Sequence, residues 1–421
     1  METGELITEM KLSKLALIAA IACGTYAGNV TAAQATEIQQ VSCECDEPIC
    51  GCEPVGDEDA CDASCDSSCD GMGCGILSKT QGDLGDPFTL FGEVGPYSVG
   101  GWVQLGYHSN SAGNIGNRFN SYADHLQLHQ AWLYAERAID SSNGWDIGGR
   151  LDYVYGTDGP DTQAFGTGDI GWDNPWDRGT QYGHALPQAY FEVGYGDLSV
   201  KLGHFYTNIG YEVVGAPDNF FYSHALTMYN SEPFTHTGVL ATLAASDDVT
   251  FMGGYTMGWD SGFDDNGDSW LGGVSLTLTD RLAVTYASVA GRFSEPWAGG
   301  GEKGYMQSVV ADYAVSDKTN YVFQTDWLNT TDLAGDAANG RNTYGINQYL
   351  IHQYSDRVAA GLRYEWYATN GDQGREHLHN LTLGMNYRQN ANLVFRPEVR
   401  WDWDAADAEE TTFGIDAVMT F

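Results

Sequence analysis

Oxygen-bearing side chains are concentrated in the segment DSGFDDNGDS, where they could bind a cation. Asp260, Asp264, Asn266 and Asp268 lie within this short stretch. Carboxylate and amide oxygens suit Ca2+, but the glutamate that closes an EF-hand loop at its twelfth position is missing. A solvated acidic loop is the favoured interpretation, with a calcium site as the alternative. No other cofactor is expected.

A serine and two histidines could suggest hydrolytic chemistry. Ser223 and His224 are adjacent and His236 follows in the same region, but no nucleophile motif surrounds the serine. The segment GTGDIG, residues 166–171, has the glycine spacing of a dinucleotide-binding turn. The alternating strand and helix pattern that such a turn needs is missing. The sequence therefore predicts that the protein is not an enzyme.

Three histidines could ligate a metal. His377 and His379 fall on one face of a predicted strand, and His352 lies on an earlier strand pattern. Two histidines at a membrane interface are the favoured interpretation of the first pair, because aromatic and amphipathic rings gather there.

Eight of the nine cysteines lie in a short acidic segment with few large apolar residues. An even number of cysteines in an exported chain favours disulfides, whose pairing spacing alone does not reveal. A flexible, partly oxidised tail and a metal site are the alternatives, the latter weakened because the segment has no histidine. The disulfide candidates are Cys43, Cys45, Cys50, Cys52, Cys61, Cys65, Cys69 and Cys74.

The elements that must position these residues are strands, because apolar side chains recur with period two beyond residue 96. In RVAAGLRYEWY, Leu362 and Trp366 fall on one face, whereas Arg363 and Glu365 fall on the other. About sixteen such segments follow one another, and the phase around Gln130 is ambiguous enough to indicate a bulge.

The connections between these segments alternate in length. Tight turns such as GD at residues 196–197 alternate with long polar loops such as residues 208–235. This alternation predicts an all-β, transmembrane, up-and-down antiparallel barrel of about sixteen strands. An interior of that size is too wide for wall side chains alone to fill, so it would hold an aqueous channel.

Charged side chains on the polar face are the proposed pore lining. They would set a field across a wet channel, or else pair across neighbouring strands and merely hold the register. They are Arg150, Asp152, Lys201, Arg363, Glu365, Arg388, Arg396, Glu398, Arg400 and Asp402. Most of the loop at 208–235 is expected to fold into the mouth as a constriction, with Glu212, Asp218, Asn219 and Ser223 as candidates.

The final segment, TTFGIDAVMTF, is the most regular strand pattern in the chain. It is expected to pair with the first strand near Trp102, so that no edge remains. The terminal aromatic Phe421 resembles the assembly signal of outer-membrane barrels, which implies the barrel-assembly machinery as a partner.

The predicted organisation has three parts. Residues 1–35 form a secretory signal peptide in which Lys11 and Lys14 precede the run LALIAAIAC, with Met10 as the expected start. Residues 36–86 form a Cys-rich acidic head and linker on the periplasmic side, and residues 87–421 form the barrel. The net charge of −38 makes nucleic acid an unexpected partner.

Two segments carry a family resemblance: GGRLDYVYGTDGPD, and LSVKLGHFYTNIGYEVVGAPDNFFYSHALTMYNSEPFTHTGVLATL. Residues 87–421 resemble the Putative beta-barrel porin-2 (OmpL-like) family of bacterial outer-membrane proteins. The resemblance implies a porin-like barrel and supplies no catalytic residues. The expected function is a passive channel for small hydrophilic solutes and ions in the outer membrane. The alternative is a structural or adhesive barrel whose loops or head bind a partner. A homo-oligomer is left open.

Overall fold

The computed structural model describes residues 83–90, 93–109, 118–120, 122–164, 172–173, 181–263, 267–293, 301–333, 335–336, 340–371, 374–404 and 409–421. The predicted signal peptide, the cysteines of the head and the segment GTGDIG lie outside these ranges. So do two of the four calcium candidates, Asp264 and Asn266.

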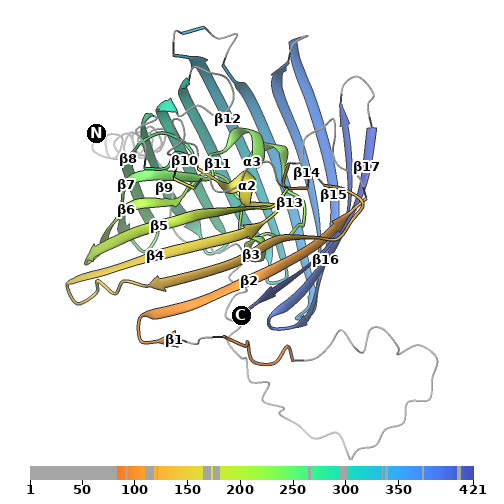
Figure 1. Cartoon of the computed structure of the whole chain (residues 1–421), viewed down its shortest axis with the longest axis horizontal. Coiled ribbons are helices and arrows are strands. Elements are labelled where there is room, and N and C mark those ends of the chain that lie inside the picture. The colour runs from red at the N-terminus through yellow and green to blue at the C-terminus, as the bar shows by residue number, and fades with distance from the viewer. Residues whose placement is uncertain are drawn as a thin grey trace, which may run out of the picture.

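Sixteen antiparallel strands form a closed barrel (Figure 1), as the period-two pattern predicts. A two-residue strand, β1 (Glu93–Val94), pairs with the first barrel strand and takes no part in closure. The barrel strands are β2 (Tyr97–His108), β3 (Gln127–Arg137), β4 (Trp145–Gly156), β5 (Gly183–Tyr195), β6 (Leu198–Tyr206), β7 (Thr235–Ser246), β8 (Val249–Thr256), β9 (Asp268–Thr279), β10 (Leu282–Phe293), β11 (Glu302–Ser316), β12 (Thr319–Asp332), β13 (Asn342–Ser355), β14 (Val358–Gly371), β15 (Gly374–Asn390), β16 (Leu393–Asp404) and β17 (Glu409–Thr420).

The two ends of the chain's sheet meet at one seam. β17 pairs with β2 over seven residue pairs, from Gly414 opposite His108 to Thr420 opposite Trp102. Phe421 extends the seam, because its backbone N–H donates to Gly101 O and its carbonyl accepts from Gly101 N–H. The predicted pairing of the last strand with the strand around Trp102 is confirmed.

The register of β2 and β3 contains the irregularity that the sequence indicates. Gln104 lies opposite Gln130, but Leu105 lies opposite Leu128, so one residue of β3 is skipped. A bulge of this kind restores the alternation of faces on either side of it.

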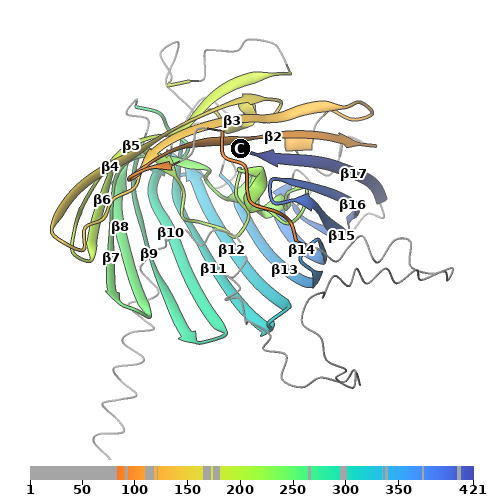
Figure 2. The same ribbon diagram turned by 90° about the horizontal axis from the view of Figure 1, so that it is seen from below.

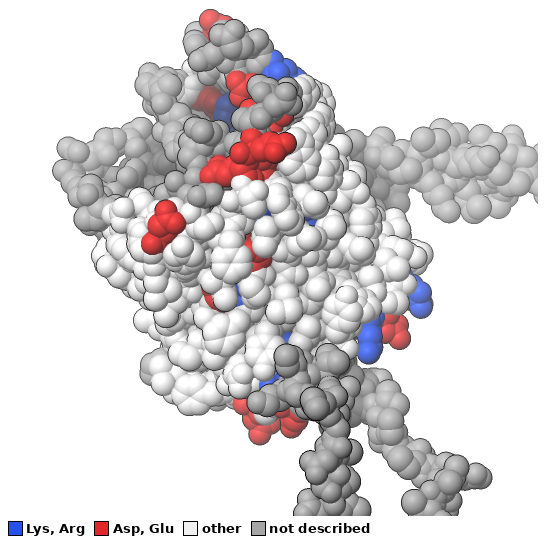
Figure 3. Space-filling view, turned by 90° about the vertical axis from the view of Figure 1, so that its right-hand side faces the viewer, with Lys and Arg blue, Asp and Glu red and all other residues white. Residues whose placement is uncertain are grey.

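The outward face carries large apolar side chains that are exposed in the isolated chain. Trp145, Phe191 and Trp270 are 77%, 73% and 69% exposed. On the wall drawn in Figure 3, charged side chains gather toward the two ends and the middle is mostly uncharged. Such a band suits the hydrocarbon of a bilayer. No helix within the described residues is long and apolar enough to span a membrane.

One end of the barrel, called the short-turn end, has two-residue turns at 196–197, 247–248, 280–281, 317–318, 356–357 and 391–392. The opposite end is the long-loop end. The chain before β1 lies at the short-turn end. There, Phe88 N–H donates to Asn392 Oδ1 over 2.6 Å and Ala391 N–H donates to Leu84 O over 3.0 Å.

Helical turns occur only in connections, within the described part of the chain. They are η2 (Arg118–Asn120), α2 (Gly159–Thr162), η5 (Ala216–Asp218) and α3 (Leu226–Ser231). Figures 1 and 2, viewed at right angles, both place α3 inside the ring of strands. The connection between β6 and β7 therefore folds into the barrel.

Candidate functional site

The candidate site is the inward loop, residues 207–234, together with the wall that holds it. It leaves the wall after β6 and returns at β7, and Thr207 N–H donates to Phe234 O across its base over 2.9 Å. Because η5 and α3 are too short to be stable alone, the conformation of this loop depends on its contacts with the wall.

A straight row of residues across the wall provides a flat surface for the loop. Gly361, Gly384, Glu398, Gly414 and His108 are successive register partners on β14, β15, β16, β17 and β2. Three of these five positions are glycine, so the backbone there is open to close approach.

Three consecutive aromatic residues of the loop cover this glycine row. The contacts are Phe220 on Gly361, Phe221 on Gly384 and Tyr222 on Gly414. A Cβ atom added at Gly384 would lie only 2.9 Å from Cδ1 of Phe221. The row therefore accommodates the aromatic rings because it lacks side chains.

Two wall carboxylates each accept hydrogen bonds from consecutive backbone N–H groups of the loop. Glu398 accepts from Tyr222 N–H over 3.0 Å and from Ser223 N–H over 3.1 Å. Glu365 accepts from Leu226 N–H over 2.8 Å and from Thr227 N–H over 2.7 Å. The second pair of donors lies at the start of α3, where backbone N–H groups have no partner within the helix.

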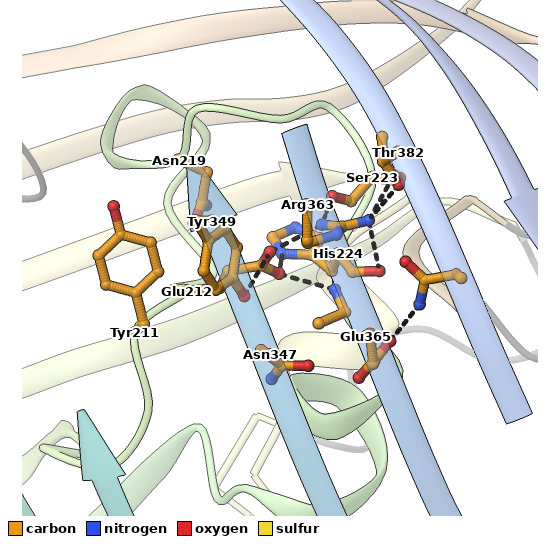
Figure 4. A network of polar contacts seen from close by, with 12 residues as sticks. Tyr211, Glu212, Asn219, Ser223, His224, Asn347, Tyr349, Arg363, Glu365 and Thr382 are labelled. Carbon is orange, nitrogen blue, oxygen red and sulfur yellow. Dashed lines mark hydrogen bonds and ion pairs between the residues drawn. The ribbon is translucent and has the colours of Figure 1, made fainter. Parts of the chain in front are cut away.

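Arg363 and Glu212 form the central ion pair of the site (Figure 4). Arg363 Nη1 lies 2.7 Å from Glu212 Oε1 and also donates to Ser223 O over 2.6 Å. Tyr349 O–H and Ala225 N–H donate to the same carboxylate. Burial alone would raise the pKa of Glu212, but the charge of Arg363 and the contacts with His224 and Ala225 lower this pKa to about 2.

Two further arginines of β16 hold backbone carbonyls of the loop. Arg396 Nη1 donates to Ala216 O over 2.8 Å and to Asn219 O over 2.6 Å. Arg400 Nη1 donates to His224 O over 2.7 Å. Both arginines also pair with wall carboxylates, Arg396 with Asp416 and Arg400 with Asp402.

On the other side of the seam, β3 fixes the loop through a chain of three side chains. Tyr222 O–H lies 2.6 Å from His129 Nε2, and His129 Nδ1 lies 3.1 Å from Asp158 Oδ1. Gln130 donates to Val214 O and accepts from Ala216 N–H. The loop is therefore bound from β3 as well as from β14 and β16.

The opposite half of the interior contains a large apolar cluster. Ile209 of the loop belongs to a buried cluster with inward side chains of β6 to β12. These wall residues include Phe205, Leu240, Met252, Leu271, Val289, Met306 and Leu328, each less than 10% exposed. The loop is consequently held by charge on one side and by apolar packing on the other.

Every barrel strand contributes at least one inward side chain that is less than 10% exposed, and we call this ring the collar. One member from each strand, in order from β2 to β17, is Gln104, Trp132, Asp152, Gln188, Phe205, Leu240, Met252, Leu271, Val289, Met306, Gln324, Asn347, Arg363, Asn380, Arg400 and Val418.

Seven of the ten proposed pore-lining residues are buried rather than open to water. They are Asp152, Arg363, Glu365, Arg396, Glu398, Arg400 and Asp402. The physical reason is that the inward loop and neighbouring wall groups cover them. Cross-strand pairing, the alternative interpretation, holds for Arg396 with Asp416, but Arg363, Glu365 and Glu398 bind the loop. A pore-lining role for the seven stays a prediction for a state in which the loop has moved.

The other three proposed lining residues lie toward the short-turn end. Arg150 contacts Glu136 and Asp152, and Lys201 lies 4.6 Å from the centre of the Tyr190 ring. Arg388 is exposed, and no ion pair or hydrogen bond of its side chain occurs within the described ranges.

The four constriction candidates all lie in the inward loop, but their side chains make different contacts. Glu212 and Ser223 bind Arg363, since Arg363 Nη2 donates to Ser223 Oγ over 2.9 Å. The Asn219 side chain bonds to the backbone of Val213 within the loop. Asp218 is exposed. That these residues narrow a pore remains a prediction.

The hydrolytic arrangement is not assembled. Ser223 Oγ binds Arg363, whereas His236 contacts Thr207 Oγ1 and Gly258 O. Nowhere in the described ranges does a hydrogen bond join Ser223 Oγ to an imidazole. His224 instead lies 3.4 Å from Glu212.

The metal candidates are also separated. His377 stacks on Trp366, and His379 stacks on Trp403 with ring centres 5.3 Å apart. His352 bonds to Thr319, near the short-turn end. Across the part of the chain that the structure describes, no three His, Cys, Asp or Glu side chains gather in a way that could hold a metal ion.

The two described calcium candidates serve separate contacts. Asp260 Oδ1 accepts from Phe234 N–H and Thr235 N–H, which ends the inward loop, and Asp268 pairs with Arg292. Burial raises the pKa of Asp260 to about 7, against the opposing effect of these two N–H groups. A calcium site that includes the other two candidates stays a hypothesis.

Comparisons with known proteins agree with this architecture. The model of the family described as Putative beta-barrel porin-2, OmpL-like, matches residues 96–421. No match was found among curated proteins. Among solved structures, the chain is similar to Salmonella typhi OmpF in complex with daunomycin, with 13% identity, a TM-score of 0.54 and coverage of 77% of this chain and 97% of that one.

Two further structures share the fold. The trimer form of in-vitro folded OmpT from Vibrio cholerae is 12% identical with a TM-score of 0.52, and covers 77% of this chain and 99% of that one. The anion-selective porin of Comamonas acidovorans is 12% identical with a TM-score of 0.51, with the same two coverages. With the family model spanning the whole barrel, the chain belongs to the Putative beta-barrel porin-2, OmpL-like family and is a porin of the bacterial outer membrane.

Proposed function

We propose that the protein is a passive channel for small hydrophilic solutes and ions, and that the inward loop selects among them. No chemistry is done on the solute. The loop is the selecting element because it is the part of the described chain that crosses the interior and contacts both halves of the wall.

The observation that carries this proposal is the inward charge at the short-turn end. Arg388 points inward on β15, because its register partner is Val394 on the inward face of β16, and it is exposed. Glu192 on β5 and Lys201 on β6 are register partners on the inward face, and both are partly exposed. Ionised groups at such positions need water, so this part of the interior is a wet vestibule.

The collar favours a second candidate function. A barrel whose interior is packed around its whole circumference could serve as a structural or adhesive anchor with a plugged lumen. Conductance separates the two, because an anchor would not conduct under any condition.

The test is single-channel recording of the purified full chain in planar bilayers, followed by a size series of neutral sugars. Stepwise currents that decrease with small sugars and are unaffected by large ones are expected. Silent bilayers in which the protein is demonstrably inserted would contradict the channel and favour the anchor. The acidic composition predicts weak cation selectivity, and a reversal potential favouring anions in a salt gradient would contradict that part.

The parts of the chain outside the barrel and its partners belong to the same proposal. We place the signal peptide in residues 1–35 and the Cys-rich head in residues 36–86 on the periplasmic side. The contacts of Leu84 and Phe88 with the turn at 391–392 support this side. Outer-membrane lipid, the barrel-assembly machinery and further copies of the chain are the proposed partners. Deleting residues 41–74 should leave conductance unchanged if the head is an accessory.

A further inference from the structure

Two buried carboxyl groups meet where the inward loop returns to the wall. Glu232 belongs to the loop and Asp326 to β12, and they are 3% and 2% exposed. One amide group joins them, because Gln324 Nε2 donates to Glu232 Oε1 over 2.6 Å and to Asp326 Oδ2 over 2.8 Å. Because both carboxyl groups accept from the same amide nitrogen, they lie close together. Two carboxylates can only accept hydrogen bonds, so a proton held by the pair would remove the repulsion between two adjacent negative charges.

The pair holds both arms of the loop. Gln324 Oε1 accepts from Tyr211 N–H on the outgoing arm, over 3.2 Å. Gly210 packs directly against the Glu232 carboxyl group, and a Cβ atom there would overlap Glu232 Oε2. Gly210 also has a φ of 92°, which a residue with a side chain rarely adopts. Through these contacts, the carboxyl pair joins both arms of the loop to β12.

The arginines near the carboxyl pair form ion pairs with other carboxylates. Arg363 pairs with Glu212, and Arg341 pairs with Glu302 over 2.9 Å while donating to Asn230 O. The other charged groups near the pair are acidic. The negative charge of Glu212 disfavours ionisation of Glu232, and that of Glu365 disfavours ionisation of Asp326. The surroundings therefore favour a bound proton over a second negative charge.

We propose that Glu232 and Asp326 share a proton and form a latch that holds the inward loop in the collar, so that ionisation of both groups releases the loop. This inference rests on the proposed channel function, because a solute must pass the collar to cross the barrel. In the latched state the collar is closed, and release of the loop opens it.

The sign of the pH dependence follows from burial. Burial raises the pKa of Glu232 well above its usual range, and the charge of Asp326 raises it further. In a released loop the carboxyl group is hydrated and has its ordinary pKa near 4.5. The latched state therefore keeps its full stability below that ordinary pKa and loses it as pH rises toward the raised pKa.

The experiment records the full chain in planar bilayers between pH 4 and pH 9, with a chelator present. The ratio of open to closed time should rise by up to about tenfold for each pH unit within the titration window. Glu232→Gln, which keeps a hydrogen-bond donor without ionising, should remain closed at high pH and lose the pH dependence. A pH-independent wild type, or a Glu232→Gln variant with an unchanged pH profile, would overturn the latch.

Two control variants separate this pair from other carboxyl groups. Glu376→Gln removes an exposed carboxylate on β15 and should keep the wild-type profile. Asp260→Asn removes another buried carboxyl group at the end of the loop. If this variant, rather than Glu232→Gln, abolishes the pH dependence, the assignment to Glu232 is wrong. Closure that occurs only with added Ca2+ would likewise show a bound cation in place of the proton.

A crosslink gives a readout that does not require conduction. A Cβ atom at Gly345 would lie 3.0 Å from Cβ of Thr227, about 0.5 Å closer than the Cβ atoms of a disulfide. A small outward shift of α3 therefore allows Thr227→Cys with Gly345→Cys to form a disulfide in the latched state. Each single variant controls for the cysteines of the head. The crosslinking rate, corrected for thiol ionisation with a free-thiol reference, should fall as pH rises. A falling rate without currents would contradict the channel alone, and a constant rate with currents would contradict the latch alone.

Discussion

Charged wall residues bind the inward loop through its backbone. Glu398 and Glu365 accept from loop N–H groups, and Arg396 and Arg400 donate to loop carbonyls. Charge-assisted hydrogen bonds of this kind are stronger than neutral ones. Because the backbone supplies the partner, the position of the loop depends more on the wall residues than on the loop side chains between them.

Arg363 is the residue whose loss should be most damaging. Arg363→Met leaves the Glu212 carboxylate buried without its guanidinium partner, which should destabilise the docked loop by about 3–5 kcal/mol. A lower midpoint of thermal unfolding in detergent and a leakier channel would measure the effect. Arg388→Met is the matched control, since Arg388 is exposed on the same face. Equal effects of the two variants would contradict a special role for the ion pair.

Glu212 should make the docked loop sensitive to strong acid. Its pKa of about 2 is below the ordinary 4.5, so its stabilising contribution is complete above pH 4.5 and is lost as pH falls toward 2. The loss amounts to about 3 kcal/mol, from 1.36 kcal/mol for each pKa unit. Tryptophan fluorescence between pH 5 and pH 2 should report it, and Glu212→Gln should remove most of that transition. A transition that persists unchanged in Glu212→Gln would assign it to another group.

At the scale of elements, the glycine row explains how a loop with three aromatic residues lies flat against a sheet. Gly384→Ala places a methyl group 2.9 Å from Phe221, which should cost about 1–3 kcal/mol and displace the loop. Higher conductance and lower thermal stability are expected. Gly253→Ala on β8 is the control, because nothing lies within 4 Å of a Cβ atom there. If both variants behave like the wild type, the row does not position the loop.

At the scale of the whole molecule, the last residue of the chain extends the pairing that closes the barrel. Phe421 makes two backbone hydrogen bonds with Gly101 at the seam, so its deletion shortens the pairing that removes the sheet edges. We expect a several-fold loss of inserted protein in the outer membrane, with unchanged conductance in the molecules that do insert. Quantifying heat-modifiable barrel in membrane fractions tests this. Thr420→Ala keeps the chain length and is the matched control. If the protein inserts normally after deletion of Phe421, the assembly signal lies in another part of the chain.

Much of this architecture was predictable because its causes are local. A strand alternates its side chains with period two, and a membrane demands that one face be apolar, so Leu362 and Arg363 could be assigned to opposite faces without coordinates. The short turns and the long loop at 208–235 follow from composition in the same way. The glycines of the row were visible as residues, but no signal in the sequence shows that they are register partners.

Sequence alone determined the strand number, the alternation of faces, the seam near Trp102 and the loop that would turn inward. Only the tertiary structure decided which charged side chains of the polar face stay exposed and which bind the inward loop. Glu398 meets Tyr222 across 176 residues of chain and Gln324 meets Glu232 across 92 residues. Such pairings depend on strand register and barrel closure, which bring distant segments together. For that reason, half of the ten charged residues proposed for the polar face proved to bind the inward loop: Arg363, Glu365, Arg396, Glu398 and Arg400.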